Sequence, residues 1–322
     1  MMTTFARFSM LAVGMTFAAV AGAQQYPSKT VRLIVPFPPG GGTDTIGRVV
    51  ALKLSEQMGQ QVIAENRPGA GANIGAEIAA KAPPDGYTLL IGSITHAIGQ
   101  TLYTRLNFDL AKDFAHVSLM ATTPMILVLH PSVPVKTVKE FVAFAKTRPE
   151  QLSYSSSGAG SAAHLAGEYF ASMTGLKMVH VPYKGGGPSM IALVGGEVSA
   201  CMATMPSAIG HIRSGRLRGL AVSTRKRSPA APEIPTVDEA GVKGYTADNW
   251  YGLVAPAGTP GPIITRLHTE THKLLKAPDV ADRLGGAGFE VMLSSPDEYA
   301  AFTRTEIAKW GKIVKAIGLK AD

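Results

Sequence analysis

One stretch near the start of the chain combines an apolar run, three consecutive glycines and a helical pattern. Apolar residues fill all but one of positions 31–35, which is typical of a strand buried on both faces, as in a parallel sheet covered by helices. Gly40–Gly42 follow, and apolar residues then recur at every fourth position from Ile46 to Met58. That spacing predicts an amphipathic helix. The order strand, tight turn, helix is the repeating unit of α/β folds.

The glycine turn is a candidate anion seat. Three glycines leave bare backbone N–H groups where the helix begins, beside the positive end of the helix dipole. A phosphate loop for nucleoside triphosphates needs Lys and then Ser or Thr after its last glycine, whereas Thr43 and Asp44 follow here. Asp44 has two interpretations, because an acid in the first helical turn suits the dipole and can also accept a hydrogen bond from a ligand. The alternative for the glycines is a tight turn with a structural role alone.

Residues 1–23 read as a secretory signal peptide. Arg7 supplies the positive start, an apolar run covers 10–20, and Ala21-Gly22-Ala23 is a small-residue cleavage site. We expect cleavage after Ala23. The apolar run is shorter than the roughly 20 residues of a membrane-spanning helix, and no other stretch approaches that length. The sequence therefore predicts an exported, soluble protein.

Length and charge bound the possibilities further. Removing 23 of 322 residues leaves about 300, twice a common domain size, so two domains are expected. Cys201 is the single cysteine, which excludes an intrachain disulfide. Without Arg7, 30 basic residues stand against 23 acidic ones, a net charge of +7. A basic balance suits acidic small molecules, a membrane surface or nucleic acid, and export disfavours nucleic acid.

Strand and helix patterns alternate from Lys29 to Gly92, which predicts right-handed crossovers and a parallel sheet. Ligands of such sheets gather at the carboxyl ends of the strands. Loops 37–44, 66–73 and 93–96 leave those ends.

A second unit of the same design begins after Pro149. A short apolar and polar run over 152–154 leads into the turn Ser155–Ser161, whose hydroxyls can donate to an anion, and then into a helical pattern. Another triple glycine, Gly185–Gly187, precedes a helix that we expect to begin at Pro188. Two such units predict two α/β lobes that face each other. The expected boundaries are 24–125 for the first lobe, 126–245 for the second, and 246–322 for a return to the first.

Other chemistries fit the sequence poorly. Gly158-x-Gly160-x-x-Ala163 follows the loose dinucleotide pattern, but no acid for the ribose occurs near 177–180. His268 and His272 lie four apart without the glutamate of the zinc-protease pattern between them at its required place. We therefore expect no cofactor and no metal. An exported enzyme that uses the Ser157/Ser161 turn remains an alternative, although nothing places a carboxylate behind His164 as a base.

A third reading rests on the basic stretch 213–227. Six basic residues fall there, and no acid occurs between Glu197 and Glu233. The stretch predicts either an anion-steering or docking surface or a solvated face near a loop.

Several motifs together resemble one family. They are Phe37-Pro38-Pro39-Gly40-Gly41-Gly42-Thr43-Asp44, Glu65-Asn66-Arg67-Pro68-Gly69-Ala70-Gly71, Pro84-Asp85-Gly86-Tyr87-Thr88-Leu89-Leu90, Val181-Pro182-Tyr183-Lys184-Gly185, Pro235-Thr236 with Glu239-Ala240-Gly241, and Ala255-Pro256-Ala257-Gly258-Thr259-Pro260. The chain resembles the periplasmic solute receptors of tripartite tricarboxylate transporters, often called Bug receptors. The motifs span nearly the whole mature chain in order. The chain departs from the family pattern at residues 201–205, and its residues 93–96 follow that pattern only loosely.

The resemblance implies a two-lobed, type II periplasmic-binding-protein fold, with a mainly parallel sheet flanked by helices in each lobe. It implies a receptor that closes over a small organic carboxylate and delivers it to a two-subunit inner-membrane permease; we expect a monomer. Backbone N–H groups bind a carboxylate without selecting the rest of the molecule, so citrate-like, dicarboxylic, amino-acid and aromatic acids all remain possible ligands. With Asp44 added from the reading above, the expected ligand contacts are Phe37, Gly41, Gly42, Thr43, Ser93, Thr95, Ser157, Gly160, Ser161, Tyr183 and Thr204.

Overall fold

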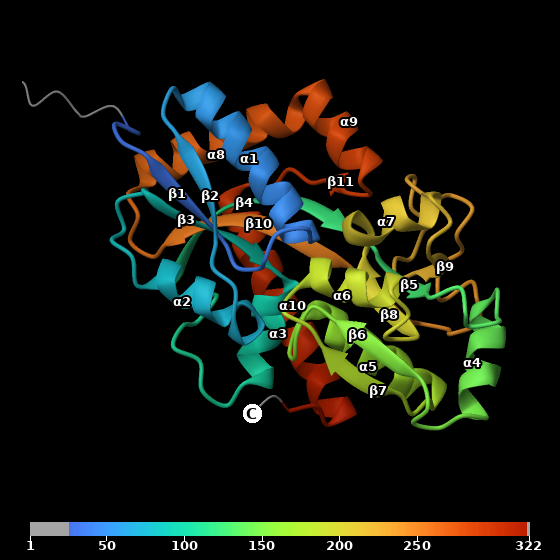
Figure 1. Cartoon of the computed structure of the whole chain (residues 1–322). Helices are drawn as coiled ribbons and strands as arrows, with labels where there is room; N and C mark the ends of the chain where they lie inside the picture. Colours follow the sequence, from blue (N-terminus) through green and yellow to red (C-terminus); the bar gives the residue numbers. More distant parts are fainter. Residues whose placement is uncertain (1–25, 321–322) are drawn as a thin grey trace, which may run out of the picture.

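The computed structural model describes residues 26–320, and its strands form two sheets, one in each half of the molecule (Figure 1). The predicted signal peptide, residues 1–23, lies outside the described residues. The first sheet has the strand order β11-β4-β10-β3-β1-β2 and the second has the order β7-β6-β8-β5-β9. Each sheet carries helices, so the predicted two-lobed α/β architecture is confirmed.

The first sheet is parallel at its core and mixed at one side. β1 pairs in parallel with β2 and β3, while β10 lies antiparallel between β3 and β4, and β11 pairs antiparallel with β4 at the edge. β1, β2, β3 and β4 therefore run in one direction. The strands are β1 (Val31–Val35), β2 (Val62–Asn66), β3 (Thr88–Ser93), β4 (Phe114–Thr123), β10 (Asn249–Pro256) and β11 (Glu290–Val291).

The second sheet follows the same plan. β6 pairs in parallel with β7 and β8, and β5 lies antiparallel between β8 and β9. All its strands except β5 therefore run in one direction. They are β5 (Met125–Leu129), β6 (Ser153–Ser156), β7 (Val179–Pro182), β8 (Ala200–Thr204) and β9 (Arg218–Val222). The chain passes between the sheets at Pro124 and again between β9 and β10.

Helices cover both faces of the sheets. The first sheet carries α1 (Gly42–Met58), α2 (Asn73–Ala80), α3 (Ile94–Leu102), α8 (Gly261–Lys276), α9 (Pro278–Gly286) and α10 (Pro296–Ile317), with a short 3-10 turn over Ala70–Ala72. The second carries α4 (Val138–Lys146), α5 (Ala162–Thr174), α6 (Gly186–Val194) and α7 (Met205–Arg213). Leu33 of β1 packs in the core under α1 and α8, and Ile34 packs in the core on the opposite face. The apolar run of β1, interrupted only by Arg32, is thus explained by burial on both faces.

Two helix starts show how the chain caps its helices. The capping box of Ser295 and Glu298 at the start of α10 is present in both directions. The expected start of α6 at Pro188 is wrong by two residues: the helix begins at Gly186, because Gly185 takes the N-cap position and its carbonyl accepts from the Ser189 N–H at 3.2 Å. Within residues 26–320, every helix is too short or too polar to cross a membrane.

Candidate functional site

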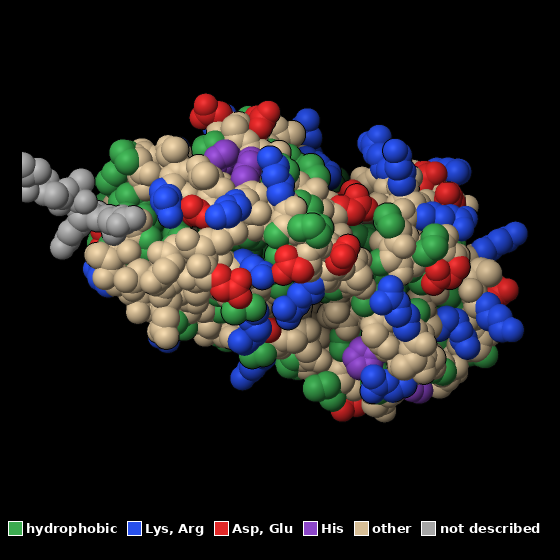
Figure 2. Space-filling model, turned by 90° about the horizontal axis from the view of Figure 1, so that it is seen from above, with side chains coloured by type: hydrophobic (Ala, Val, Ile, Leu, Met, Phe, Trp, Pro, Cys, Tyr) green, Lys and Arg blue, Asp and Glu red, His purple; other side chains and the backbone are tan. Residues whose placement is uncertain are grey.

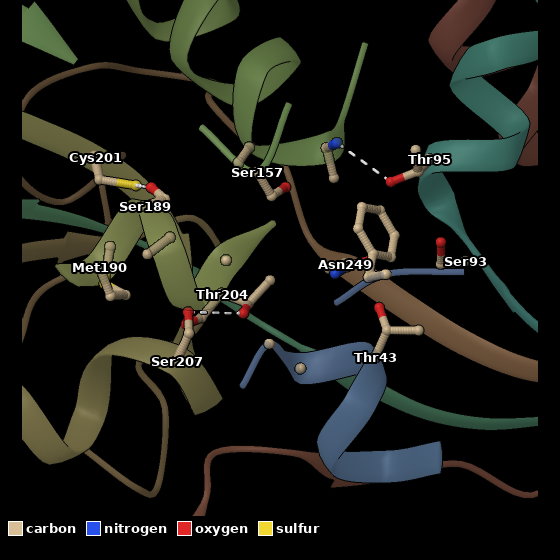
Figure 3. Close-up of a pocket in the computed structure, with 17 residues that line it drawn as sticks. Thr43, Ser93, Thr95, Ser157, Ser189, Met190, Cys201, Thr204, Ser207 and Asn249 are labelled. Carbon is tan, nitrogen blue, oxygen red and sulfur yellow. Dashed lines mark hydrogen bonds between the residues drawn. The ribbon is translucent and has the colours of Figure 1, made fainter. Parts of the chain in front are cut away.

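A cavity lies between the two sheets and receives side chains and backbone from both (Figure 3). It encloses about 510 Å³ of space between atoms, a figure that includes its opening to solvent. None of the residues that line it is Lys, Arg, His, Asp or Glu. They are Phe37, Gly41, Gly42, Thr43, Ser93, Thr95, Ser157, Ala162, Ala163, Gly186, Ser189, Met190, Cys201, Ala203, Thr204, Ser207 and Asn249.

Five helices begin at this cavity. α1 and α3 come from the first lobe, and α5, α6 and α7 come from the second. Each helix start carries a partial positive charge and backbone N–H groups without intrahelical partners. A cavity without charged side chains is therefore electropositive, which suits a small anion.

The start of α1 offers free backbone donors to the cavity. Gly41 is the N-cap in an extended conformation, with φ −99° and ψ 173°. Within residues 26–320, the N–H groups of Gly41, Gly42 and Thr43 have no hydrogen-bond acceptor. Thr43 is 6 % exposed and also lines the cavity. Its side-chain hydroxyl has no hydrogen-bond partner within residues 26–320. Together these groups form a ready-made carboxylate seat.

Asp44 stabilises this turn from behind and does not line the cavity. Its carboxylate accepts from the Gly40 N–H at 3.1 Å, from Arg48 at 3.0 Å and from Asn66 at 2.9 Å. Although burial opposes ionisation, these hydrogen bonds hold the pKa of Asp44 below its ordinary value. Of the two interpretations of Asp44, the geometry favours the structural one.

At the start of α3, one hydrogen bond fixes the turn and another joins the two lobes. The Ser93 N–H donates to Nδ1 of His96 at 3.0 Å, and Thr95 Oγ1 accepts from the Ala162 N–H of α5 at 3.3 Å. Burial lowers the pKa of His96 to about 4, so this imidazole is neutral at pH 7. Thr95 thus ties the first lobe to the second beside the cavity.

The turn 157–161, expected as the second seat, uses most of its donors internally. The Gly160 N–H donates to Nδ1 of His164 at 3.1 Å, and Ser161 Oγ accepts from the His164 N–H at 3.2 Å as the cap of α5. Ser161 is fully buried, and neither it nor Gly160 lines the cavity. Ser157 alone of this turn does, and His164 is committed to Gly160 rather than to a serine nucleophile.

Tyr183 lines a second, wider cleft of about 1510 Å³ that opens outward. Phe37 and Ser157 line both spaces, so this cleft leads to the inner cavity. The Tyr183 hydroxyl donates to Glu197 at 3.1 Å. Tyr183 therefore stands at the approach to the cavity and not in its wall.

The structure thus brings together Phe37, Gly41, Gly42, Thr43, Ser93, Thr95, Ser157 and Thr204, and leaves Asp44, Gly160, Ser161 and Tyr183 outside the wall. Nine of the 17 lining residues were not among the expected contacts, and they include Asn249, Gly186 and Met190. Gly186 belongs to the second triple glycine. The sequence analysis used these glycines only to predict the helix that follows them, although they resemble the glycine turn before α1. Gly41 and Gly186 face one another: a Cβ built at Gly186 would lie 3.5 Å from the Gly41 Cα.

Several basic side chains of the stretch 213–227 form hydrogen bonds or ion pairs within the fold. Arg213 donates to the carbonyls of Ala230 and Gly286, and Arg218 donates to those of Val133 and Val135. Arg227 pairs with Glu239 at 2.8 Å. On the face seen in Figure 2, basic and acidic side chains are intermixed.

Comparison with known proteins agrees with this geometry. The sequence profile described as "Tripartite tricarboxylate transporter family receptor" matches residues 46–319. Protein BugT of Bordetella pertussis is 36% identical over 97% of this chain and 98% of its own length. A UPF0065 protein from Pseudomonas sp. strain P51 is 36% identical, covering 92% of this chain and 89% of its own length.

Solved structures give the same result. R. palustris Rpa4515 with adipate has a TM-score of 0.89 and 38% identity, over 92% of this chain and 99% of its own. The periplasmic binding protein BugD has a TM-score of 0.89 and 30% identity, over 92% and 100%. MatC from Rhodopseudomonas palustris with bound malate has a TM-score of 0.86 and 31% identity, over 90% and 100%. The chain therefore belongs to the tripartite tricarboxylate transporter receptor family, the Bug family of periplasmic solute receptors.

Proposed function

We propose that this receptor closes its two lobes on a small carboxylate, holds the carboxylate at the starts of α1 and α6, and delivers it to a two-subunit inner-membrane permease. One observation carries the proposal: the N–H groups of Gly41, Gly42 and Thr43 border a cavity with no charged side chain and have no acceptor within residues 26–320. Rpa4515 and MatC, with adipate and malate in their structures, support an acid as the ligand.

The expected affinity follows from the donors. Each hydrogen bond to a carboxylate contributes about 1.5–3 kcal/mol, and a helix start adds up to about 2 kcal/mol in a buried site. Four to six donors, less the costs of desolvation and closure, leave about 8 kcal/mol, which corresponds to a micromolar dissociation constant. The contacts that we propose are those eight expected residues that line the cavity, together with Gly186.

The remaining parts of the proposal concern organisation and export. We infer that residues 1–23 are a signal peptide cleaved after Ala23, and that the mature chain works as a monomer. The proposed lobes are 24–125 with 246–322, and 126–245; the strand content of the two sheets is compatible with these boundaries. An enzyme is not proposed, since the family consists of solute receptors.

The test is Gly41→Val in the mature chain, measured by thermal shift against a panel of small acids. A Cβ at Gly41 meets no atom closer than 3.9 Å, and its extended backbone suits valine, so the variant is expected to fold. The branched side chain would fill the seat and abolish the shift caused by the acid that stabilises the unmodified chain. Gly261→Val is the matched control, because Gly261 begins α8 with open space around its Cβ. A full ligand shift in Gly41→Val would overturn the assignment of this seat.

A further inference from the structure

The cavity has two chemically different ends. Thr43, Ser93, Thr95 and Asn249 lie on one side, while Met190, Ser189 and Cys201 lie on the other (Figure 3). The free N–H groups of Gly41, Gly42 and Thr43 lie at the start of α1, where Thr43 is on the first side. The opposite side, which we call the far end, consists of Ser189, Met190, Cys201 and Ala203, from α6 and β8.

The far end is apolar and almost closed to solvent. Met190 and Cys201 are each 2 % exposed and Ala203 is 4 % exposed, and all three belong to the core between α6 and β8. Burial raises the pKa of the Cys201 thiol, which therefore stays a neutral, weakly polar group. No cation lines this end of the cavity.

The polar groups near the far end satisfy one another. The Ser189 hydroxyl donates to Ser155 Oγ at 2.8 Å and contacts Cys201 Sγ at 3.6 Å. Ser207 Oγ donates to the Thr204 carbonyl at 2.8 Å and lies 3.1 Å from Thr204 Oγ1. The hydroxyl hydrogens of Ser189 and Ser207 are thus already used within the protein wall.

A second carboxylate packed against Met190, Cys201 and Ala203 would be buried without a counter-ion from residues 26–320, and the neighbouring serine hydroxyls are already engaged. Burying such a charge is unfavourable, whereas burying a methyl or methylene group there is favourable. We infer that the ligand is a short monocarboxylate with an apolar tail, its carboxylate at the α1 start and its tail against Met190, Cys201 and Ala203. This inference rests on the proposed function and makes it specific; it separates this chain from Rpa4515 and MatC, whose structures hold the dicarboxylates adipate and malate.

The experiment compares matched acids by calorimetry and thermal shift with the mature chain. Butyrate, valerate and hexanoate are paired with succinate, glutarate and adipate, which have the same carbon numbers and a second carboxylate. We expect the best monocarboxylate to bind at least tenfold more tightly than its dicarboxylate partner. Equal or tighter binding of the dicarboxylates would overturn this inference and leave the proposed function standing. Failure of every acid in the broad panel to bind would instead overturn the proposed function.

A variant that places a positive charge at the far end gives a second test of the preference for monocarboxylates. Met190→Lys carries an ammonium group to the far end on a flexible stem and should shift the preference toward the dicarboxylates by tenfold or more. Ile191→Lys is the matched control: it adds the same charge at the next position of α6, where the side chain is 73 % exposed, and should keep the original order of affinities. An unchanged order in a folded Met190→Lys variant would contradict the inferred position of the tail. If that variant does not fold, the acid series with the unmodified chain decides the question alone.

Discussion

Gly187 of the second lobe lies directly against Pro39 of the first: a Cβ at Gly187 would be 2.9 Å from the Pro39 carbonyl oxygen. That distance is too short for a carbon atom beside a rigid backbone oxygen. Gly187 is helical, at the start of α6, so alanine suits its conformation and the obstruction concerns only the approach of the lobes. The two triple glycines therefore allow the lobes to meet backbone to backbone.

The first prediction concerns Gly187→Ala. Overpacking costs about 1–3 kcal/mol, and here the cost applies to the closed form alone, so ligand affinity should fall about tenfold or more. The melting temperature of the ligand-free protein should stay the same or rise slightly, because alanine favours the helix.

Isothermal calorimetry and ligand-free melting curves measure these two effects. Gly210→Ala is the control, since Gly210 lies within α7 and a Cβ there meets nothing within 4 Å. Unchanged affinity in Gly187→Ala would show that the contact with Pro39 does not limit closure.

The second prediction concerns Asp44→Asn. The carboxylate accepts three hydrogen bonds in the turn that shapes the seat, so its loss should lower the free energy of unfolding by about 1.5–3 kcal/mol at pH 7. Since the folded pKa of Asp44 lies below the unfolded value, this stabilisation is present above the unfolded pKa and is lost as the pH falls through the folded one. The difference between the two proteins should therefore shrink toward pH 3. Urea unfolding at pH 7, 5 and 3 measures it, with the exposed Asp282→Asn as the control. A difference that persists at pH 3 would refute the ionic contribution.

The cavity wall shows which parts of the fold and of the site could be predicted from the sequence. The strand, glycine turn and helix units were readable because burial on both faces and helical spacing leave local patterns, and eight expected contacts do line the cavity. Gly160 and Ser161 fell outside its wall because their partner, His164, takes the turn's N–H through a hydrogen bond that no spacing rule encodes. Asn249 was missed for another reason: it enters from a strand that returns from the distant C-terminal part of the chain, and only the sheet order brings it beside Ser93.

The third prediction is that ligand binding depends weakly on pH. Among the described residues that line the cavity, Cys201 alone has a titratable side chain, and burial raises its pKa away from neutrality. Small monocarboxylic acids are almost completely ionised above pH 6, and backbone donors do not titrate. The dissociation constant should change less than threefold between pH 6 and 8, measured by calorimetry in one buffer series at constant ionic strength. A tenfold change would mean that a titrating side chain contacts the ligand.

The fourth prediction is that stability, unlike binding, depends on pH through His96. Burial lowers its folded pKa to about 4, below the ordinary value of about 6.5, so the unfolded chain takes up a proton first as the pH falls. The stabilisation is therefore complete above about pH 6.5 and is lost as the pH falls toward 4, by about 2 kcal/mol between pH 7.5 and 5. His96→Asn keeps an acceptor for the Ser93 N–H and removes the titrating imidazole. Between pH 7.5 and 5, the free energy of unfolding of this variant should therefore fall by about 2 kcal/mol less than that of the unmodified chain. Parallel slopes for His96→Asn and the unmodified chain would show that His96 is not held neutral by the fold.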